Sequence, residues 1–129
     1  MAVINPTIYA GGHDLSAGNR VPRGTVIVEW VLDAGDTGAP FRIPTHGDKT
    51  VQNTSGSYGT STFTFQGSND PVTVTNYFTL ADPQGNAISK TANALEAILE
   101  NTVWVRPAYS AGTGTALTAT LVCETSARG

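Results

Sequence analysis

The sequence predicts an all-β domain: an antiparallel β-sandwich, jelly-roll or Ig-like, with seven to eight strands, one short helix and an extended N-terminal arm. Two observations carry this prediction. Short runs in which apolar residues alternate with threonine recur along the chain, and alternation at period two is typical of strands with one buried face. Turns rich in Gly, Pro, Asn and Asp separate these runs.

The first segment, residues 1–23, predicts the arm. It contains prolines and glycines and has no sustained periodicity. We expect it to be disordered or held against another surface, with short extended pairing to a neighbour. The folded domain is expected at residues 24–124, followed by a loose tail at 125–129. The apolar residues available for pairing in the arm are Val3, Ile4, Ile8 and Tyr9.

A strong strand begins after Gly24, with Val26, Val28, Trp30 and Leu32 on one face. Its other face carries Ile27 and Val31. Because both faces are apolar, we expect the second face to be covered by the arm, by a second sheet or by another subunit. Next along the chain, residues 39–44 have proline near each end and indicate an edge strand, and residues 49–53 are a weaker strand candidate.

The clearest alternation lies in residues 60–66, which place Phe63 and Phe65 on one face and threonines on the other. Residues 72–80 repeat the pattern. It predicts that Val72, Val74, Phe78 and Leu80 point inward. A type I turn at residues 82–85 and a short run at 87–91 follow.

One segment predicts a helix instead of a strand. Asn93 is followed three residues later by Glu96, a capping pattern, and the apolar residues that follow have helical spacing. We expect one or two turns ending by Asn101. The apolar residues in question are Leu95, Ile98 and Leu99.

Residues 101–124 predict a hairpin at the centre of the sheet. Val103 and Val105 alternate with Trp104 and Arg106, a turn with two glycines follows, and residues 117–123 alternate again. Two alternating runs joined by a glycine-containing turn are typical of a hairpin. Cys123 falls in the apolar series, which indicates a small buried residue and not a nucleophile.

The composition restricts the classes of function. The chain has 129 residues, enough for one domain, and only 13% of them are charged, for a net charge of −3. No positive footprint for nucleic acid exists, and neither a membrane span nor a secretory leader is recognisable. We therefore expect synthesis in the cytoplasm. A surface with so few charges suits a protein that remains bound to another molecule.

No arrangement of residues predicts an enzyme, a metal site or a cofactor. His13 and His46 lie in glycine-rich loops and belong to no metalloprotease, zinc or nucleophile motif. The remaining acidic candidates are better explained by turn formation or by solvated strand positions. Those candidates are the loop pairs Asp33 with Asp36 and Asn69 with Asp70, and the strand residues Glu29 and Glu124.

The two tryptophans are the candidates for an aromatic sugar platform, although tryptophan in an alternating strand is more often a core or interface residue. Trp104 shares its face with Arg106, opposite the valines. We expect Trp104 to be exposed on the free molecule and buried in an assembly, and Trp30 to lie in the core.

Three segments resemble small β-sandwich proteins encoded among the head genes of tailed bacteriophages. They read Thr-Phe-Thr-Phe-Gln-Gly-Ser-Asn-Asp at 62–70, Val-Trp-Val-Arg-Pro-Ala at 103–108, and Gly-Thr-Gly-Thr-Ala-Leu-Thr-Ala-Thr-Leu at 112–121. Such proteins are capsid decoration, or cement, proteins and related head or fibre modules. The Gly-Ser-Asn-Asp turn also occurs in discoidin-like sugar-binding sandwiches, but here Pro71 and Val72 replace the usual glycine and aromatic residue.

The resemblance implies a structural virion protein on the capsid surface, without catalysis or cofactor. Its expected partners are the major capsid protein and further copies of itself, in a dimer or trimer. A carbohydrate- or receptor-binding module of a head or fibre is the alternative. The expected contact residues are Ile4, Ile8, Tyr9, Arg20, Arg23, Ile27, Val31, Trp104 and Arg106.

Overall fold

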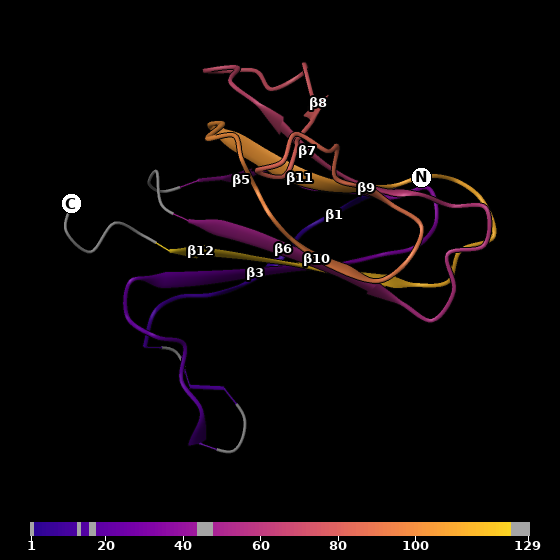
Figure 1. Ribbon diagram of the computed structural model, residues 1–129. Coiled ribbons are helices and arrows are strands. Elements are labelled where there is room, and N and C mark those ends of the chain that lie inside the picture. Colours follow the sequence, from indigo (N-terminus) through magenta and orange to yellow (C-terminus); the bar gives the residue numbers. More distant parts are fainter. Residues whose placement is uncertain (1, 13, 16–17, 44–47, 125–129) are drawn as a thin grey trace.

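The computed structural model describes residues 2–12, 14–15, 18–43 and 48–124. These residues form two β-sheets packed face to face and no α-helix, so the protein is an all-β sandwich (Figure 1). The strands are β1 (Val3–Ile4), β2 (Thr7–Tyr9), β3 (Thr25–Leu32), β4 (Thr37–Gly38), β5 (Phe41–Arg42), β6 (Lys49–Ser55), β7 (Phe63–Ser68), β8 (Phe78–Thr79), β9 (Ser89–Lys90), β10 (Ala94–Ala97), β11 (Trp104–Tyr109) and β12 (Leu117–Glu124).

The order of the strands is that of a jelly roll. One sheet, called here the β11 sheet, runs β1-β4-β11-β7-β8, with β5 also paired to β11 and β9 to β7. The other, the β12 sheet, runs β10-β6-β12-β3-β2. From β3 onward the chain alternates between the sheets, except that β4 and β5 stay together in the β11 sheet, as do β7, β8 and β9. This alternation gives the double Greek key of a jelly roll. An Ig-like sandwich instead keeps its first two strands in one sheet.

The core fills the space between the inner faces of the two sheets, and the alternation predicted it well. Trp30, Phe63 and Phe65 are completely buried. The rings of Trp30 and Phe65 meet edge to face at 6.4 Å, and the Trp30 indole N–H donates to the Ala39 carbonyl over 3.0 Å. On β12, the inner series runs from Leu117 to Cys123, which is 2% exposed, as predicted.

The predicted central hairpin is wrong. β11 pairs with β7, β4 and β5 in one sheet, whereas β12 pairs with β3 and β6 in the other. The residues between them cross from one sheet to the other. Gly114 lies in this crossing and packs closely against Tyr109, because a Cβ at Gly114 would lie only 2.1 Å from the Tyr109 hydroxyl oxygen. Alternation identified both strands but not their partners, because a strand of either sheet turns its apolar side to the same core.

The predicted helix is also wrong. Residues 94–97 form β10, which pairs antiparallel with β6 from Ala94 opposite Asn53 to Ala97 opposite Thr50. Ile98 is buried, but Leu95 and Leu99 are 63% and 52% exposed, so these three residues do not form one apolar face. A capping residue contributes only about 1 kcal/mol to a helix. In the folded protein these residues instead pair along the otherwise open edge of β6.

Residues 72–80 depart from their predicted burial. Leu80 is buried, but Val72 is 85% exposed and Phe78 is 69% exposed. Phe78–Thr79 pairs with β7, and the Leu80 amide donates to the Phe65 carbonyl over 2.9 Å. The residues before Phe78 do not join the sheet, because the Asp70 carboxylate accepts hydrogen bonds from the Thr75 and Asn76 amides and holds them in a loop.

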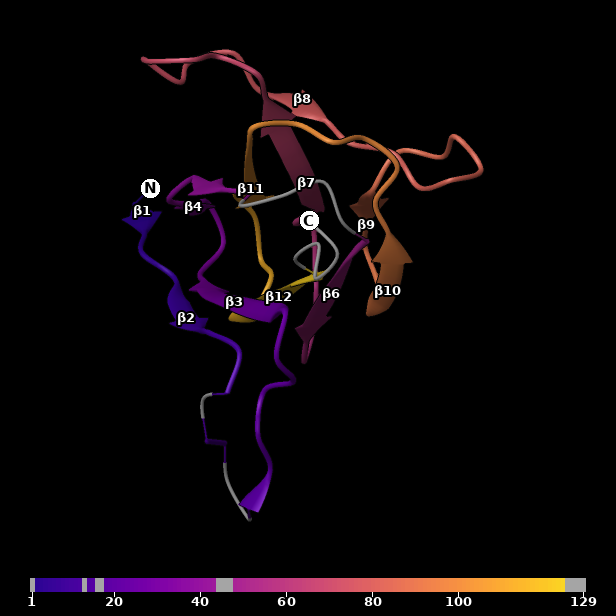
Figure 2. The same ribbon diagram turned by 90° about the vertical axis from the view of Figure 1, so that its left-hand side faces the viewer.

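The start of the chain pairs with the chain itself. β1 runs parallel to β4, and β2 runs antiparallel to β3, so residues 3–9 make short extended pairings within the chain. Residues 10–12, 14–15 and 18–24, called here the projecting loop, extend away from the sandwich on the side of the β12 sheet (Figures 1 and 2).

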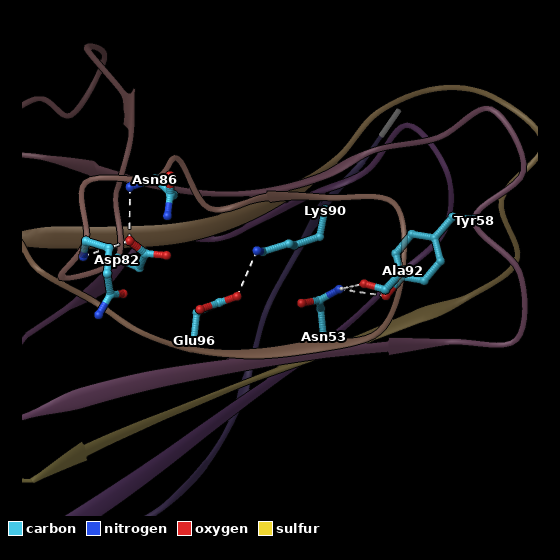
Figure 3. A network of polar contacts seen from close by, with 8 residues as sticks. Asn53, Tyr58, Asp82, Asn86, Lys90, Ala92 and Glu96 are labelled. Atoms are coloured by element: carbon cyan, nitrogen blue, oxygen red, sulfur yellow. Dashed lines mark hydrogen bonds and ion pairs between the residues drawn. The ribbon is translucent and has the colours of Figure 1, made fainter.

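A polar cluster joins the two sheets at the β9 and β10 edge (Figure 3). Lys90 of β9 and Glu96 of β10 form an ion pair of 2.7 Å. The buried Asn53 side chain donates to the Tyr58 hydroxyl over 2.6 Å and to the Ala92 carbonyl over 3.2 Å. Every buried side-chain nitrogen or oxygen in the described ranges has a hydrogen-bond partner.

Candidate interaction surfaces

The outer face of the β12 sheet is one candidate surface. Residues directly opposite each other in an antiparallel pair point to the same side, so the register defines this face. One row crosses all five strands. The row consists of Tyr9, Ile27, Val122, Thr50 and Ala97.

This face carries few charges. On either side of the row lie threonines, Gln52 and two further apolar residues, and the only carboxylates among the outward residues of these strands are Glu29 and Glu124. Val31 and Leu95 are 53% and 63% exposed. β2 extends the edge of β3 within the same sheet and does not lie over its face. Val31 on that face is exposed, whereas Ile27 is half-buried.

The projecting loop lies beside this face. Two contacts join the outgoing and returning halves of the loop. The Gly12 amide donates to the Val21 carbonyl over 2.8 Å, and Arg20 forms an ion pair of 2.8 Å with Asp14. Val21 is buried at its base, while Arg20 and Arg23 are exposed. Figure 2 shows the loop between β2 and β3 projecting away from the sandwich on the side of the β12 sheet.

The outer face of the β11 sheet is organised differently, because the loop at residues 69–77 binds to it. The Trp104 indole N–H donates to the Asp70 carbonyl over 3.0 Å. The Arg106 guanidinium donates to the Gln66 side chain over 2.9 Å and lies 3.6 Å from the centre of the Tyr77 ring. Burial lowers the pKa of Arg106, and burial raises the pKa of Tyr77.

Two of the resemblance segments meet at this place. The Asn69 side-chain oxygen accepts a hydrogen bond of 3.0 Å from the Val103 amide, and Asp70 accepts from Trp104 as described above. The Gly-Ser-Asn-Asp turn and the Trp-Val-Arg-Pro strand thus form one structural unit, in which the turn fixes the loop and the strand supplies the surface beneath it.

A groove of about 430 Å³ lies beside this unit on the same outer face. The small side chain of Ala108 forms its floor, with Thr37 opposite on one neighbouring strand and Thr64 on the other. The lining contains no charged side chain. Its polar groups are the hydroxyls of Thr37, Thr62, Thr64 and Ser110 and the amide of Gln66.

Two kinds of candidate chemistry can be assessed in the described residues, metal binding and the Cys123 thiol. No group of three or more His, Cys, Asp or Glu side chains is close enough together in this part of the chain to hold a metal ion. Burial raises the pKa of the Cys123 thiol to about 11, which keeps it protonated and unreactive at neutral pH. His13 and His46 lie outside the described residues.

The acidic loop candidates make local hydrogen bonds. The two oxygens of the Asp36 carboxylate accept from the Ala2 and Asp33 amides over 3.0 and 2.9 Å. The Asp70 carboxylate likewise accepts hydrogen bonds from the Thr75 and Asn76 amides. These bonds, first that from Asn76 and then that from Thr75, lower the pKa of Asp70. Trp30 is in the core, so the two tryptophans do not form a shared platform.

The predicted contact residues fall into separate groups. Tyr9, Ile27 and Val31 lie together on the outer face of the β12 sheet, and Arg20 and Arg23 lie on the projecting loop at its side. Ile8 is 51% exposed at the β2 edge. Trp104 and Arg106 belong to the opposite face of the molecule. Ile4 packs against the hydrophobic core and offers little to a partner.

Sequence reasoning missed three features. The groove was missed because its floor depends on the register that places Ala108 between two threonines. The stacking of Tyr77 on Arg106 was missed because the alternation in residues 72–80 predicted a strand where residues 72–77 form a loop. Lys49 at the start of β6 was missed although a signal existed, since it precedes Val51 and Asn53 in the inward series of that strand.

No protein-family model and no curated protein matches this chain. Among solved structures, a cupin domain from Bordetella pertussis is similar over 95% of this chain and 93% of its own, with 13% identity and a TM-score of 0.44. Peruvianin-I, a cysteine peptidase from Thevetia peruviana latex, matches over 95% of this chain and 62% of its own, with 17% identity and a TM-score of 0.48. Neither likeness assigns a function to this chain.

Proposed function

We propose that the protein is a structural virion protein that decorates and stabilises the outer surface of a bacteriophage head by binding across capsid subunits. The observation that carries this proposal is the outer face of the β12 sheet, which is broad, poor in charge and uncovered by the described residues. An apolar and threonine-rich sheet face of this kind is a typical protein-binding surface, because few charges have to be desolvated on contact.

Two further features support the proposal. The projecting loop extends the reach of a compact domain on this side, and its exposed Arg23 is available for an acidic partner. Jelly rolls are common among viral capsid domains, although the fold also serves lectins and cupins. Stabilisation would follow from mass action, since each bound copy favours the assembled state of the subunits it joins.

The test uses heads of the encoding phage that lack this protein. We expect the purified protein to co-sediment with expanded heads, and the filled heads to resist heat and osmotic shock better than bare heads. Ile27→Lys places an unpaired charge in the contact and should weaken binding at least about tenfold. Thr64→Lys, on the opposite outer face, is the matched control and should bind normally. Equal binding by both variants would contradict the proposal, as would bare heads that are as robust as filled ones.

A second candidate is a carbohydrate- or receptor-binding module of a head or fibre. The groove on the β11 sheet favours it, because neutral hydroxyl and amide groups around an apolar floor suit a neutral hydroxylated ligand. The variant that tests it is Ala108→Phe, which fills the groove, with Thr120→Phe on the other outer face as control. A glycan retained by the control and lost by Ala108→Phe would establish this function.

A further inference from the structure

The end of the sandwich where β6 begins and β12 ends contains a buried lysine. Lys49 is 3% exposed and lies opposite Cys123 in the register of the two strands. Its ammonium nitrogen donates a hydrogen bond to the side-chain carbonyl oxygen of Asn101, in the segment between β10 and β11. The Lys49 side-chain nitrogen and the Asn101 carboxamide, 52 residues apart in the chain, are therefore in direct contact.

The surroundings of Lys49 favour its uncharged form more than water does. Burial lowers the pKa of the Lys49 amine, while Cys123, Asp48 and Glu100 act in the opposite direction. An uncharged lysine amine is a nucleophile, whereas the ammonium is not. Glu100 is held in place by a 2.8 Å bond from the Ala81 amide to its carboxylate, so a fixed acidic group adjoins Asn101 in the chain.

We propose that Lys49 and Asn101 are joined by an intramolecular isopeptide bond that the folded domain forms by itself. The Lys49 Nζ attacks the Asn101 side-chain carbonyl carbon, the new Nζ–Cγ bond forms, and the Cγ–Nδ2 bond breaks. A proton passes from the attacking amine to the departing nitrogen, so the products are one secondary amide and one ammonia. No oxidant, metal or cofactor takes part, and Asp48 and Glu100 are the carboxylates available to carry the proton.

Folding supplies what this reaction otherwise lacks. A free amine and a carboxamide react extremely slowly in water, but a fixed contact gives effective concentrations of about 10⁵–10⁸ M in well-oriented cases. The chain contains only one other lysine, Lys90, and it is engaged with Glu96 in an ion pair at the β9 and β10 edge (Figure 3). The inference is independent of the proposed function, although a covalent link between distant segments would suit a protein that bears mechanical load.

The decisive experiment is the intact mass of the full chain, purified in its folded state and then denatured. We expect a mass lower than the sequence mass by one molecule of ammonia. Proteolysis followed by tandem mass spectrometry should yield a branched peptide in which Lys49 is bonded to Asn101. A mass equal to the sequence mass would overturn the proposal.

The intact masses of variants distinguish the isopeptide bond from other reactions that release ammonia. Lys49→Met and Asn101→Ala should each restore the full calculated mass, whether or not the variant folds. Lys90→Met and Asn86→Ala are the matched controls, one lysine and one loop asparagine, and should keep the deficit. An ammonia deficit that survives Lys49→Met would indicate a cyclised asparagine or another modification, and would overturn the proposal equally.

Discussion

The two outer faces of the sandwich are built from the same kind of alternating strand but differ in what covers them. On the β11 sheet, the loop at residues 69–77 lies over the strands, and Trp104 and Arg106 are satisfied by Asp70, Gln66 and Tyr77. On the β12 sheet, no described segment covers the corresponding positions, and Val31 and Leu95 remain exposed. One face is thus completed by the chain itself, whereas the other is left open.

This difference shows which residues a partner can use. Trp104 and Arg106 have the residue types common in interfaces, but their polar groups are already engaged within the chain, so a partner gains little by approaching them. The open face has weaker residue types, mainly threonine, valine and isoleucine, over a wider area. The comparison therefore favours a broad contact of many small contributions on the β12 sheet.

The largest expected effect tests whether the two sheets share one core. Phe65→Ala, from the β11 sheet, should lower the free energy of unfolding by about 3–5 kcal/mol, and Leu121→Ala, from the β12 sheet, by about 2–5 kcal/mol, because each empties a fully buried site. Urea denaturation measures both. A loss of less than about 1 kcal/mol for either variant would mean that the two sheets do not contribute equally to one core. The two sheets would then differ on their inner faces as well as on their outer faces.

The next effect concerns the covered face. Arg106→Ala removes the stacking on Tyr77 and the bond to Gln66, and should lower the free energy of unfolding by about 1–3 kcal/mol. Arg42→Ala, an exposed arginine on the neighbouring β5, is the control and should change it by less than about 0.5 kcal/mol. Equal effects would mean that the loop does not depend on Arg106.

A smaller, local effect is expected in acid. The amide hydrogen bonds from Asn76 and Thr75 lower the pKa of Asp70 below its usual value of 3.8, so the ionised form is favoured in the folded state. The stabilisation is present above that usual value and is lost as the pH falls through the lowered pKa. We expect the loop at residues 69–77 to loosen there, and Trp104 fluorescence should report it.

The matched variants for this acid response are Asp70→Asn and Asp14→Asn. Asp70→Asn should loosen the loop at every pH and remove the acid-dependent change in Trp104 fluorescence. Asp14, whose ion pair with Arg20 lies on the projecting loop, is remote from Trp104, and its variant should keep the change. An unchanged acid response in Asp70→Asn would show that another group titrates.

The smallest effect is expected on the open face. Thr120→Ala, at the centre of the outer face of the β12 sheet, should change the free energy of unfolding of the free protein by no more than about 0.5 kcal/mol, because its side chain packs against no covering segment. Calorimetry of the free protein measures this. A loss above about 1.5 kcal/mol would mean that the face has an internal structural role and is not reserved for a partner.

The sequence by itself determined the class of the fold and most of the buried residues. Alternation at period two is a local property of a strand, and it placed Trp30, Phe63, Phe65 and the inner series of β12 correctly because each strand must turn one face to a core. Composition likewise indicated a surface poor in charge. The same reasoning placed Cys123 in the core, where its thiol is unreactive.

Only the tertiary structure decided which strands are neighbours. It separated β11 from β12, paired β10 with β6 in place of the expected helix, and left Val72 and Phe78 on the surface. The physical reason is that backbone pairing joins segments distant in the chain, and any strand with one apolar side fits either sheet. The groove at Ala108, the covering of Arg106 and the contact of Lys49 with Asn101 all arise from that pairing.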